Sequence, residues 1–109
     1  MSGHQIISCE RARELLAAGQ VTVLDMRDYR SYRAKRIEGA LLLHDGLQQA
    51  IVNENDVDKP ILIYCYRGIT SKEKAEYFLE LGFKHAYSLE GGFTEWSKAA
   101  PGAQAAGSQ

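Results

Sequence analysis

Residues 61–71 read ILIYCYRGITS, and this stretch indicates the fold more clearly than any other. Its first four residues form an apolar run of strand length. A short loop containing Gly68 follows. From Ser71 to Leu81 apolar residues recur at helical spacing, and Gly82 stops the pattern. A strand that passes through a tight loop into a helix is the repeating unit of α/β proteins.

The same alternation continues on both sides of this unit. Ser8 is expected to cap a helix from Cys9 to Ala18, which Gly19 ends. The remaining strands are predicted at residues 6–7, 21–24, 40–43 and 86–89, and the remaining helices at residues 28–35, 47–52 and 93–99. Apolar strands separated by helices indicate a mostly parallel sheet. We therefore predict an α/β domain with a central five-stranded sheet and helices on both faces.

Length and composition are those of one ordinary globular domain. The chain has 109 residues, of which 45% are hydrophobic and 25% are charged. This length suits a single domain, which we assign to residues 1–100. Residues 101–109 contain only proline, glycine, alanine, glutamine and serine, and they are predicted to form a disordered tail.

Charge and the small number of cysteines restrict the possible functions. The formal net charge is −1 with both signs mixed, which argues against nucleic acid or an anionic membrane as the main partner. No apolar run is long enough to cross a bilayer, and the first residues lack a signal-peptide pattern, so we expect a cytoplasmic protein. Cys9 and Cys65 are too few for a disulfide scaffold, and the three histidines are scattered. We therefore expect neither a metal nor another cofactor.

The candidate nucleophile is Cys65, at the end of the most apolar strand. Ligands of open α/β sheets bind outside the carboxyl ends of the strands. Loop N–H groups and the N-terminus of the next helix can converge on a sulfur placed there and stabilise its thiolate. Gly68 allows the backbone angles that such a loop needs, Ser71 is expected to be the helix N-cap, and Arg67 adds positive charge at the rim. A lone cysteine after a strand is often only a core residue, but a core cysteine needs neither Gly68 nor Arg67 beside it.

Three motifs, in order along the chain, resemble those of a known family. An apolar strand ends in Asp25-Met26-Arg27, the Cys65 loop follows, and Gly91-Gly92-Phe93 precedes Trp96. Together these motifs resemble the rhodanese family, and the likeness covers nearly all of the chain before residue 101. Within that family the chain looks most like the short, single-domain bacterial thiosulfate sulfurtransferases.

The resemblance implies a sulfurtransferase with Cys65 as its catalytic residue. The Cys65 thiolate would take the outer sulfur of thiosulfate, release sulfite, and hold the sulfur as a persulfide until cyanide or a thiol, such as that of thioredoxin, accepts it. The loop residues after Cys65 would bind the substrate; they are Tyr66, Arg67, Gly68, Ile69, Thr70 and Ser71. In the family, a basic residue two places after the cysteine accompanies thiosulfate rather than mercaptopyruvate, and Arg67 holds that place.

Two alternatives belong to other functional classes. A sulfur-relay module would pass the persulfide to a partner protein, and the sequence does not separate it from the enzyme. A phosphatase related to this fold would need an arginine six places after the cysteine, where Ser71 stands. The chain also departs from the common family pattern at Arg36, where many members have histidine, and at Thr70, where many have arginine.

Several other polar or aromatic residues are expected to have structural roles. Asp25 should tie the strand end to the nearby backbone or to Arg27. Trp96 should belong to the core, and Cys9 should be a spectator. Tyr66 should shape the loop or its rim rather than donate a proton. Whether Asp25, Arg36 or His44 contributes to the site is left open by the sequence.

Overall fold

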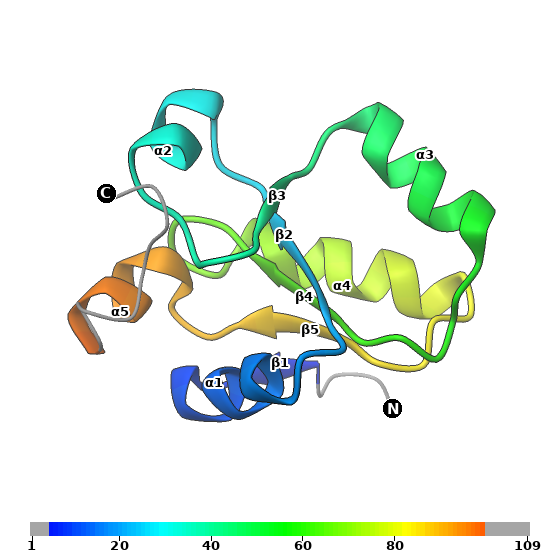
Figure 1. Cartoon of the computed structure of the whole chain (residues 1–109), viewed down its shortest axis with the longest axis horizontal. Helices are drawn as coiled ribbons and strands as arrows, with labels where there is room; N and C mark the ends of the chain where they lie inside the picture. Colours follow the sequence, from blue (N-terminus) through cyan, green and yellow to red (C-terminus); the bar gives the residue numbers. More distant parts are fainter. Residues whose placement is uncertain (1–4, 100–109) are drawn as a thin grey trace.

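A computed structural model describes residues 5–99 of the chain as one parallel α/β layer structure (Figure 1). The strands and helices alternate along the chain, as predicted. In order they are β1 (Ile6–Ile7), α1 (Cys9–Ala18), β2 (Thr22–Asp25), α2 (Tyr29–Ala34), β3 (Leu41–Leu42), α3 (Asp45–Glu54), β4 (Ile61–Tyr64), α4 (Thr70–Glu80), β5 (Ala86–Leu89) and α5 (Gly92–Ala99). The predicted tail at residues 101–109 lies outside the described residues.

The five strands form one sheet in the order β1-β5-β4-β2-β3, and every pair is parallel. β4 is the central strand of the sheet. All four of its residues are buried, as expected for a strand with helices over both faces of the sheet. Its neighbours β2 and β5 are paired with it over most of their length. The predicted five-stranded sheet is confirmed, and the end of β4 lies between the ends of two other strands.

Two hydrophobic clusters cover the two faces of the sheet. On one face Leu62 and Tyr64 pack with Ala12 of α1 and with Phe93 and Trp96 of α5. The other face packs against α3 and α4; its buried members are Leu24, Ile61, Ile63, Ala75, Phe78, Phe83 and Ala86. Figure 1 shows α1 and α5 on one side of the sheet and α3 and α4 on the other. Among residues 5–99, no helix has the length and apolar character needed to cross a bilayer.

The helix ends follow local capping rules with a few corrections. Ser8 caps α1 through its hydroxyl and Gly19 ends it with a positive φ of 87°, as predicted. α3 is longer than the predicted residues 47–52 because His44 Nδ1 accepts the Leu47 N–H and so caps the helix two residues earlier. His44 is therefore a helix cap in the structure.

A buried ion pair lies beneath the loop that follows β4. The Asp25 carboxylate, fully buried at the end of β2, accepts hydrogen bonds from the Arg27 guanidinium and backbone N–H, as predicted. It also accepts a 2.6 Å hydrogen bond from the Tyr64 hydroxyl, which in turn accepts the Ile37 N–H. Burial and the adjacent carboxylate raise the pKa of Tyr64, so its hydroxyl stays protonated and keeps donating. The guanidinium lies over the Phe93 ring, 4.1 Å from its centre.

We expect Arg27→Met to destabilise the fold by about 3–5 kcal/mol, because it leaves the Asp25 carboxylate buried without its counter-charge. Urea unfolding followed by circular dichroism would measure the change. Arg11→Met is the matched control: Arg11 pairs with Glu14 at the surface, where the two side chains are 73% and 69% exposed. That variant should cost less than about 1 kcal/mol. Equal losses in the two variants would contradict the structural role assigned to the buried pair.

Candidate active site

After β4 ends, the chain turns through a short loop into α4 (Figure 1). Cys65 is the first residue of that loop. The residue is only 5% exposed, so its sulfur faces the protein more than solvent. The Gly68 N–H points at Cys65 Sγ over 3.2 Å, and Ser71 Oγ lies 3.3 Å from the same sulfur. In the thiol form Cys65 donates to Ser71 Oγ, whereas an ionised sulfur accepts from the Ser71 hydroxyl as well as from the Gly68 N–H. The loop and the start of α4 therefore form the predicted cradle around one sulfur atom.

Burial and hydrogen bonding act on this sulfur in opposite directions. Burial by itself raises the pKa of Cys65, because it removes water from the thiolate. Hydrogen bonds from the Ser71 and Thr70 hydroxyls and from the Ser71 and Gly68 N–H groups outweigh burial and lower the pKa to about 7. At neutral pH a large fraction of Cys65 is therefore thiolate, which is the nucleophilic form.

Ser71 contributes to the site in a different way from the prediction. α4 begins at Thr70 with Ile69 as its N-cap, and no side chain caps it. Ser71 is inside the helix and fully buried, and its hydroxyl faces Cys65 Sγ instead of a backbone N–H. The prediction that Ser71 is the N-cap was wrong, because the sulfur and a second buried hydroxyl, Ser88, compete for its hydrogen bonds.

The segment where β5 turns into α5 packs directly against the backbone of the Cys65 loop. The Phe93 N–H donates to the Cys65 carbonyl over 2.9 Å, and the Thr94 N–H donates to the Tyr66 carbonyl over 3.1 Å. A Cβ on Gly92 would lie 2.6 Å from the Cys65 carbonyl oxygen, and one on Gly68 would lie 3.0 Å from the Gly91 nitrogen. Both glycines also have positive φ. The two backbones approach so closely that neither position leaves room for a side chain.

The rim of the site is formed by the other loop residues predicted to bind substrate. A hollow of about 200 Å³ opens beside the sulfur, lined by Cys65, Tyr66, Arg67, Ile69 and Thr70. The Tyr66 hydroxyl donates to Asp28 Oδ2 over 2.7 Å and lies 3.0 Å from Ser31 Oγ, so its ring is tied to the start of α2. Tyr66 thus shapes the rim, as expected. Ile69 is 65% exposed at the opposite end of the loop.

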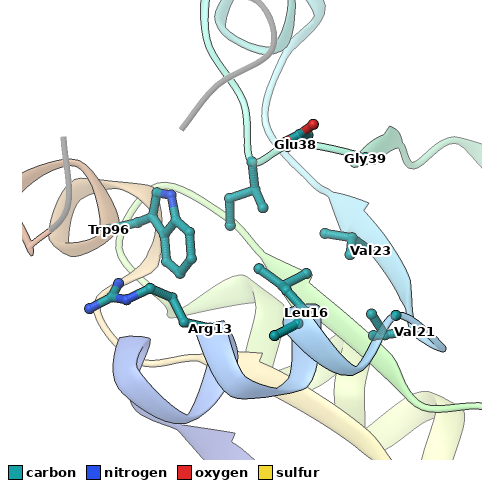
Figure 2. Close-up of a pocket in the computed structure, with 10 residues that line it drawn as sticks. Arg13, Leu16, Val21, Val23, Glu38, Gly39 and Trp96 are labelled. Carbon is teal, nitrogen blue, oxygen red and sulfur yellow. The ribbon is translucent and has the colours of Figure 1, made fainter. Parts of the chain in front are cut away.

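A larger hollow, of about 450 Å³, lies away from the cysteine, between α1, α5 and the segment around Gly39 (Figure 2). Leu16, Val21 and Val23 form its apolar wall, and Arg13 lies against the Trp96 ring, 5.3 Å from its centre. Neither cysteine lines this hollow. Trp96 is 1% exposed, which confirms that it belongs to the core. The larger hollow is therefore not the candidate active site. That site is the smaller hollow, because Cys65 lines it.

Cys9 and Arg36 do not line the small hollow beside Cys65. Cys9 begins α1 and is half-buried, and burial raises the pKa of its thiol. Arg36 packs over the Tyr32 ring, 4.5 Å from its centre, and donates to the Tyr32 carbonyl. Within residues 5–99 no group of three or more histidine, cysteine or acidic side chains is arranged to hold a metal ion. The sequence analysis missed Ser88, whose hydroxyl lies 2.7 Å from Ser71 Oγ and whose signal was a hydroxyl inside an apolar strand.

The chain is similar to known proteins over most of its length. A family model described as "Rhodanese-like domain" matches residues 8–99. The chain is 34% identical to thiosulfate sulfurtransferase GlpE of Shewanella oneidensis, over 91% of the chain and 98% of the relative. It is 40% identical to thiosulfate sulfurtransferase GlpE of Pseudoalteromonas translucida, over 85% and 89%. The human single-domain sulfurtransferase TSTD1 has the same fold, with a TM-score of 0.71, 22% identity, and coverage of 89% of this chain and 98% of that one.

We expect the rate at which Cys65 is alkylated to rise with pH through a midpoint near 7, because the thiolate forms there and reacts faster than the thiol. Iodoacetamide labelling of a Cys9→Ser variant between pH 5 and pH 10 would measure the midpoint for Cys65 alone. Cys65→Ser, which keeps only Cys9, is the matched control and should show a midpoint above the ordinary thiol value of about 8.5. Equal midpoints in the two variants would show that the cradle does not act on the thiolate.

Proposed function

The chain belongs to the rhodanese-like domain family, and we propose that it is a sulfurtransferase that moves the outer sulfur of thiosulfate through a persulfide on Cys65. The observation that carries the proposal is the sulfur of Cys65 held by the Gly68 N–H and the Ser71 hydroxyl at the end of β4, with a pKa near neutral. The two GlpE relatives, which the chain matches over most of its length, are named as thiosulfate sulfurtransferases.

In the first step the Cys65 thiolate attacks the outer sulfur of thiosulfate. A bond forms between the two sulfurs, the sulfur–sulfur bond of thiosulfate breaks, and sulfite leaves with the electron pair. The donors that surround Cys65 Sγ also face the incoming dianion and hold the negative charge that passes to the outer sulfur. Arg67 is exposed at the rim, where its positive charge attracts thiosulfate before and during the transfer.

In the second step a thiolate or cyanide attacks the outer sulfur of the persulfide. The sulfur–sulfur bond to Cys65 breaks, the electron pair returns to Cys65 Sγ, and the acceptor leaves as a persulfide or as thiocyanate. The low pKa of Cys65 makes it a good leaving group here. We place this cycle in the cytoplasm, where thiols are kept reduced and no cofactor is needed to restore the enzyme.

A second candidate function, a persulfide carrier that hands sulfur to a partner protein, is favoured by the surface around Cys65. Ile69 is 65% exposed and Tyr66 is 47% exposed, and both line the small hollow. Exposed apolar side chains beside a reactive sulfur offer a contact surface for a protein that presents its own thiol. Thioredoxin is one such acceptor. A phosphatase has no such support, because the sixth residue after Cys65 is Ser71, whereas a phosphatase loop needs an arginine there to clamp the phosphoryl group.

Treatment of the protein with thiosulfate should add one sulfur atom to Cys65, and cyanide should remove it. Intact-mass spectrometry would detect the gain and the loss. Cys65→Ser should gain nothing, whereas Cys9→Ser is the matched control and should load like the unchanged protein. Sulfur found on Cys9 would refute the assignment of the nucleophile. A protein that loads from a persulfide donor but not from thiosulfate would favour the carrier function.

Arg67→Ala should raise KM for thiosulfate and change kcat less, because the charge of thiosulfate is present both before and during the transfer. The loss in kcat/KM should be about 1–3 kcal/mol if Arg67 donates a charge-assisted hydrogen bond to the substrate. Arg67→Lys keeps the charge but loses the planar fork, so kinetics of both variants at two salt concentrations separate a direct contact from a screened field. Unchanged kinetics of Arg67→Ala at low salt would remove the argument for thiosulfate.

A further inference from the structure

Ser88 is a fully buried serine in the middle of β5, next to the central strand of the sheet. Its backbone pairs with Ile63 of β4 on one side and with Ile6 of β1 on the other. A hydroxyl in such a place costs free energy unless it has a hydrogen-bond partner. The partner is Ser71: the two hydroxyl oxygens are 2.7 Å apart, and Ser71 Oγ is 3.3 Å from Cys65 Sγ. The three side chains form a chain of hydrogen bonds from β5 to the sulfur.

The number of protons shared by Cys65, Ser71 and Ser88 shows which protonation state of the sulfur these hydrogen bonds favour. Within residues 5–99 the Ser88 hydroxyl makes no hydrogen bond other than the one with Ser71. With Cys65 as a thiolate, Ser88 donates to Ser71 and Ser71 donates to the sulfur, so both hydroxyl protons have an acceptor. With Cys65 as a thiol there are three protons for the same two contacts. Either one proton lacks an acceptor, or the thiol turns away and Ser71 donates to a weakly accepting sulfur.

We propose that Ser88 is a positioning residue of the sulfurtransferase site, whose hydroxyl donates to Ser71 Oγ and thereby directs the Ser71 proton onto Cys65 Sγ when that sulfur is anionic. Ser88 acts only through Ser71, since it makes no hydrogen bond to the sulfur itself. When Ser88 donates to Ser71 and Ser71 donates to the sulfur, each hydrogen bond also strengthens the next, because a hydroxyl that accepts a hydrogen bond becomes a better donor.

This role rests on the proposed function, in which Cys65 Sγ is anionic twice in each cycle. It is anionic before it attacks thiosulfate. In the persulfide the charge lies on the outer sulfur, and Sγ becomes a weak acceptor. When the acceptor takes the outer sulfur, the electron pair returns to Sγ, and the Ser71 proton again has an anion to bind. Ser88 therefore favours the reacting thiolate and its departure as a leaving group by the same contact.

The hydrogen bond that stabilises the anionic sulfur comes from a hydroxyl and not from a charged side chain. The charged residues in the segments around the sulfur are Arg67 in the loop, Lys72 and Glu73 in the first turns of α4, Glu90 in the turn after β5, and Asp25 at the end of β2. Within residues 5–99 none of them hydrogen-bonds to Cys65 Sγ, and the Asp25 carboxylate is paired with Arg27 and Tyr64. Substitutions of Ser88 leave all of these charges unchanged, so a change in thiolate stability would report the hydroxyl chain.

The test is the pKa of Cys65 in a double-mutant cycle, measured by alkylation against pH in the Cys9→Ser background. Ser88→Ala should raise the pKa by about 0.5 to 1 unit. Ser71→Ala should raise it at least as much. The double variant should have the pKa of Ser71→Ala alone, because Ser88 has no path to the sulfur without Ser71. Tyr87→Phe removes a hydroxyl from the neighbouring position of β5 and is the matched control, expected to leave the pKa unchanged.

Two results would overturn the proposal: a Ser88→Ala pKa equal to that of the Cys9→Ser parent, or additive effects of the two serine substitutions. If Ser88→Ala fails to fold, Ser88→Thr and Ser88→Val replace it, because they have the same shape and only threonine keeps the hydroxyl. Threonine should then give the lower pKa, and equal values would overturn the proposal.

A second measurement keeps this proposal distinct from the proposed function. Cyanide should discharge the loaded Ser88→Ala persulfide about twofold to threefold more slowly than the parent, because a more basic thiolate leaves more slowly. The alkylation pKa requires no sulfur donor. Suppose that the parent takes no sulfur from thiosulfate but the four variants show the pKa values described above. Thiosulfate is then not the sulfur donor, and the role of Ser88 stands. If the parent loads normally and the pKa values do not move, the role of Ser88 is wrong and the enzyme assignment stands.

Discussion

The close approach of two backbones, the Cys65 loop and the turn between β5 and α5, is the constraint on which the site depends. The Phe93 and Thr94 N–H groups bind the carbonyls of Cys65 and Tyr66, and Gly92 has no side chain that would hold the two segments apart. The Arg27 guanidinium packs on the Phe93 ring and binds Asp25 at the end of β2. The loop is therefore fixed from both neighbouring strands, and its donors stay aimed at one sulfur.

This rigidity explains how the pKa of a nearly buried thiol is lowered. Burial disfavours a thiolate, and in Cys65 the hydrogen-bond donors of Ser71, Thr70 and Gly68 outweigh that cost. Cys9 shows the opposite result in the same chain, because burial raises its pKa and no donor among residues 5–99 hydrogen-bonds to its sulfur. The difference between the two cysteines is a difference in preorganised donors, and it is the basis for proposing Cys65 as the nucleophile.

Much of this arrangement follows from local patterns in the sequence. The run ILIY predicted the central strand, Ser8 and Gly19 predicted both ends of α1, and Cys65 with Gly68 predicted a cradle at a strand end. The assignment of Ser71 failed for a physical reason. Serine at a helix start usually caps the helix, but here the sulfur and the Ser88 hydroxyl offer Ser71 better partners. Neither partner is visible in the residues adjacent to it.

The sequence by itself determined which segments become strands and helices and which cysteine ends a buried strand, because hydrophobic periodicity, glycine stops and caps act over a few residues. Only the tertiary structure decided which strand ends meet. Parallel pairing placed β5 beside β4, which brings Ser88 to Ser71 and Gly92 to Cys65, and it placed β2 on the other side, which brings Asp25 to Tyr64. These contacts join residues that are distant along the chain, and the pairing that creates them comes from burying both faces of one sheet.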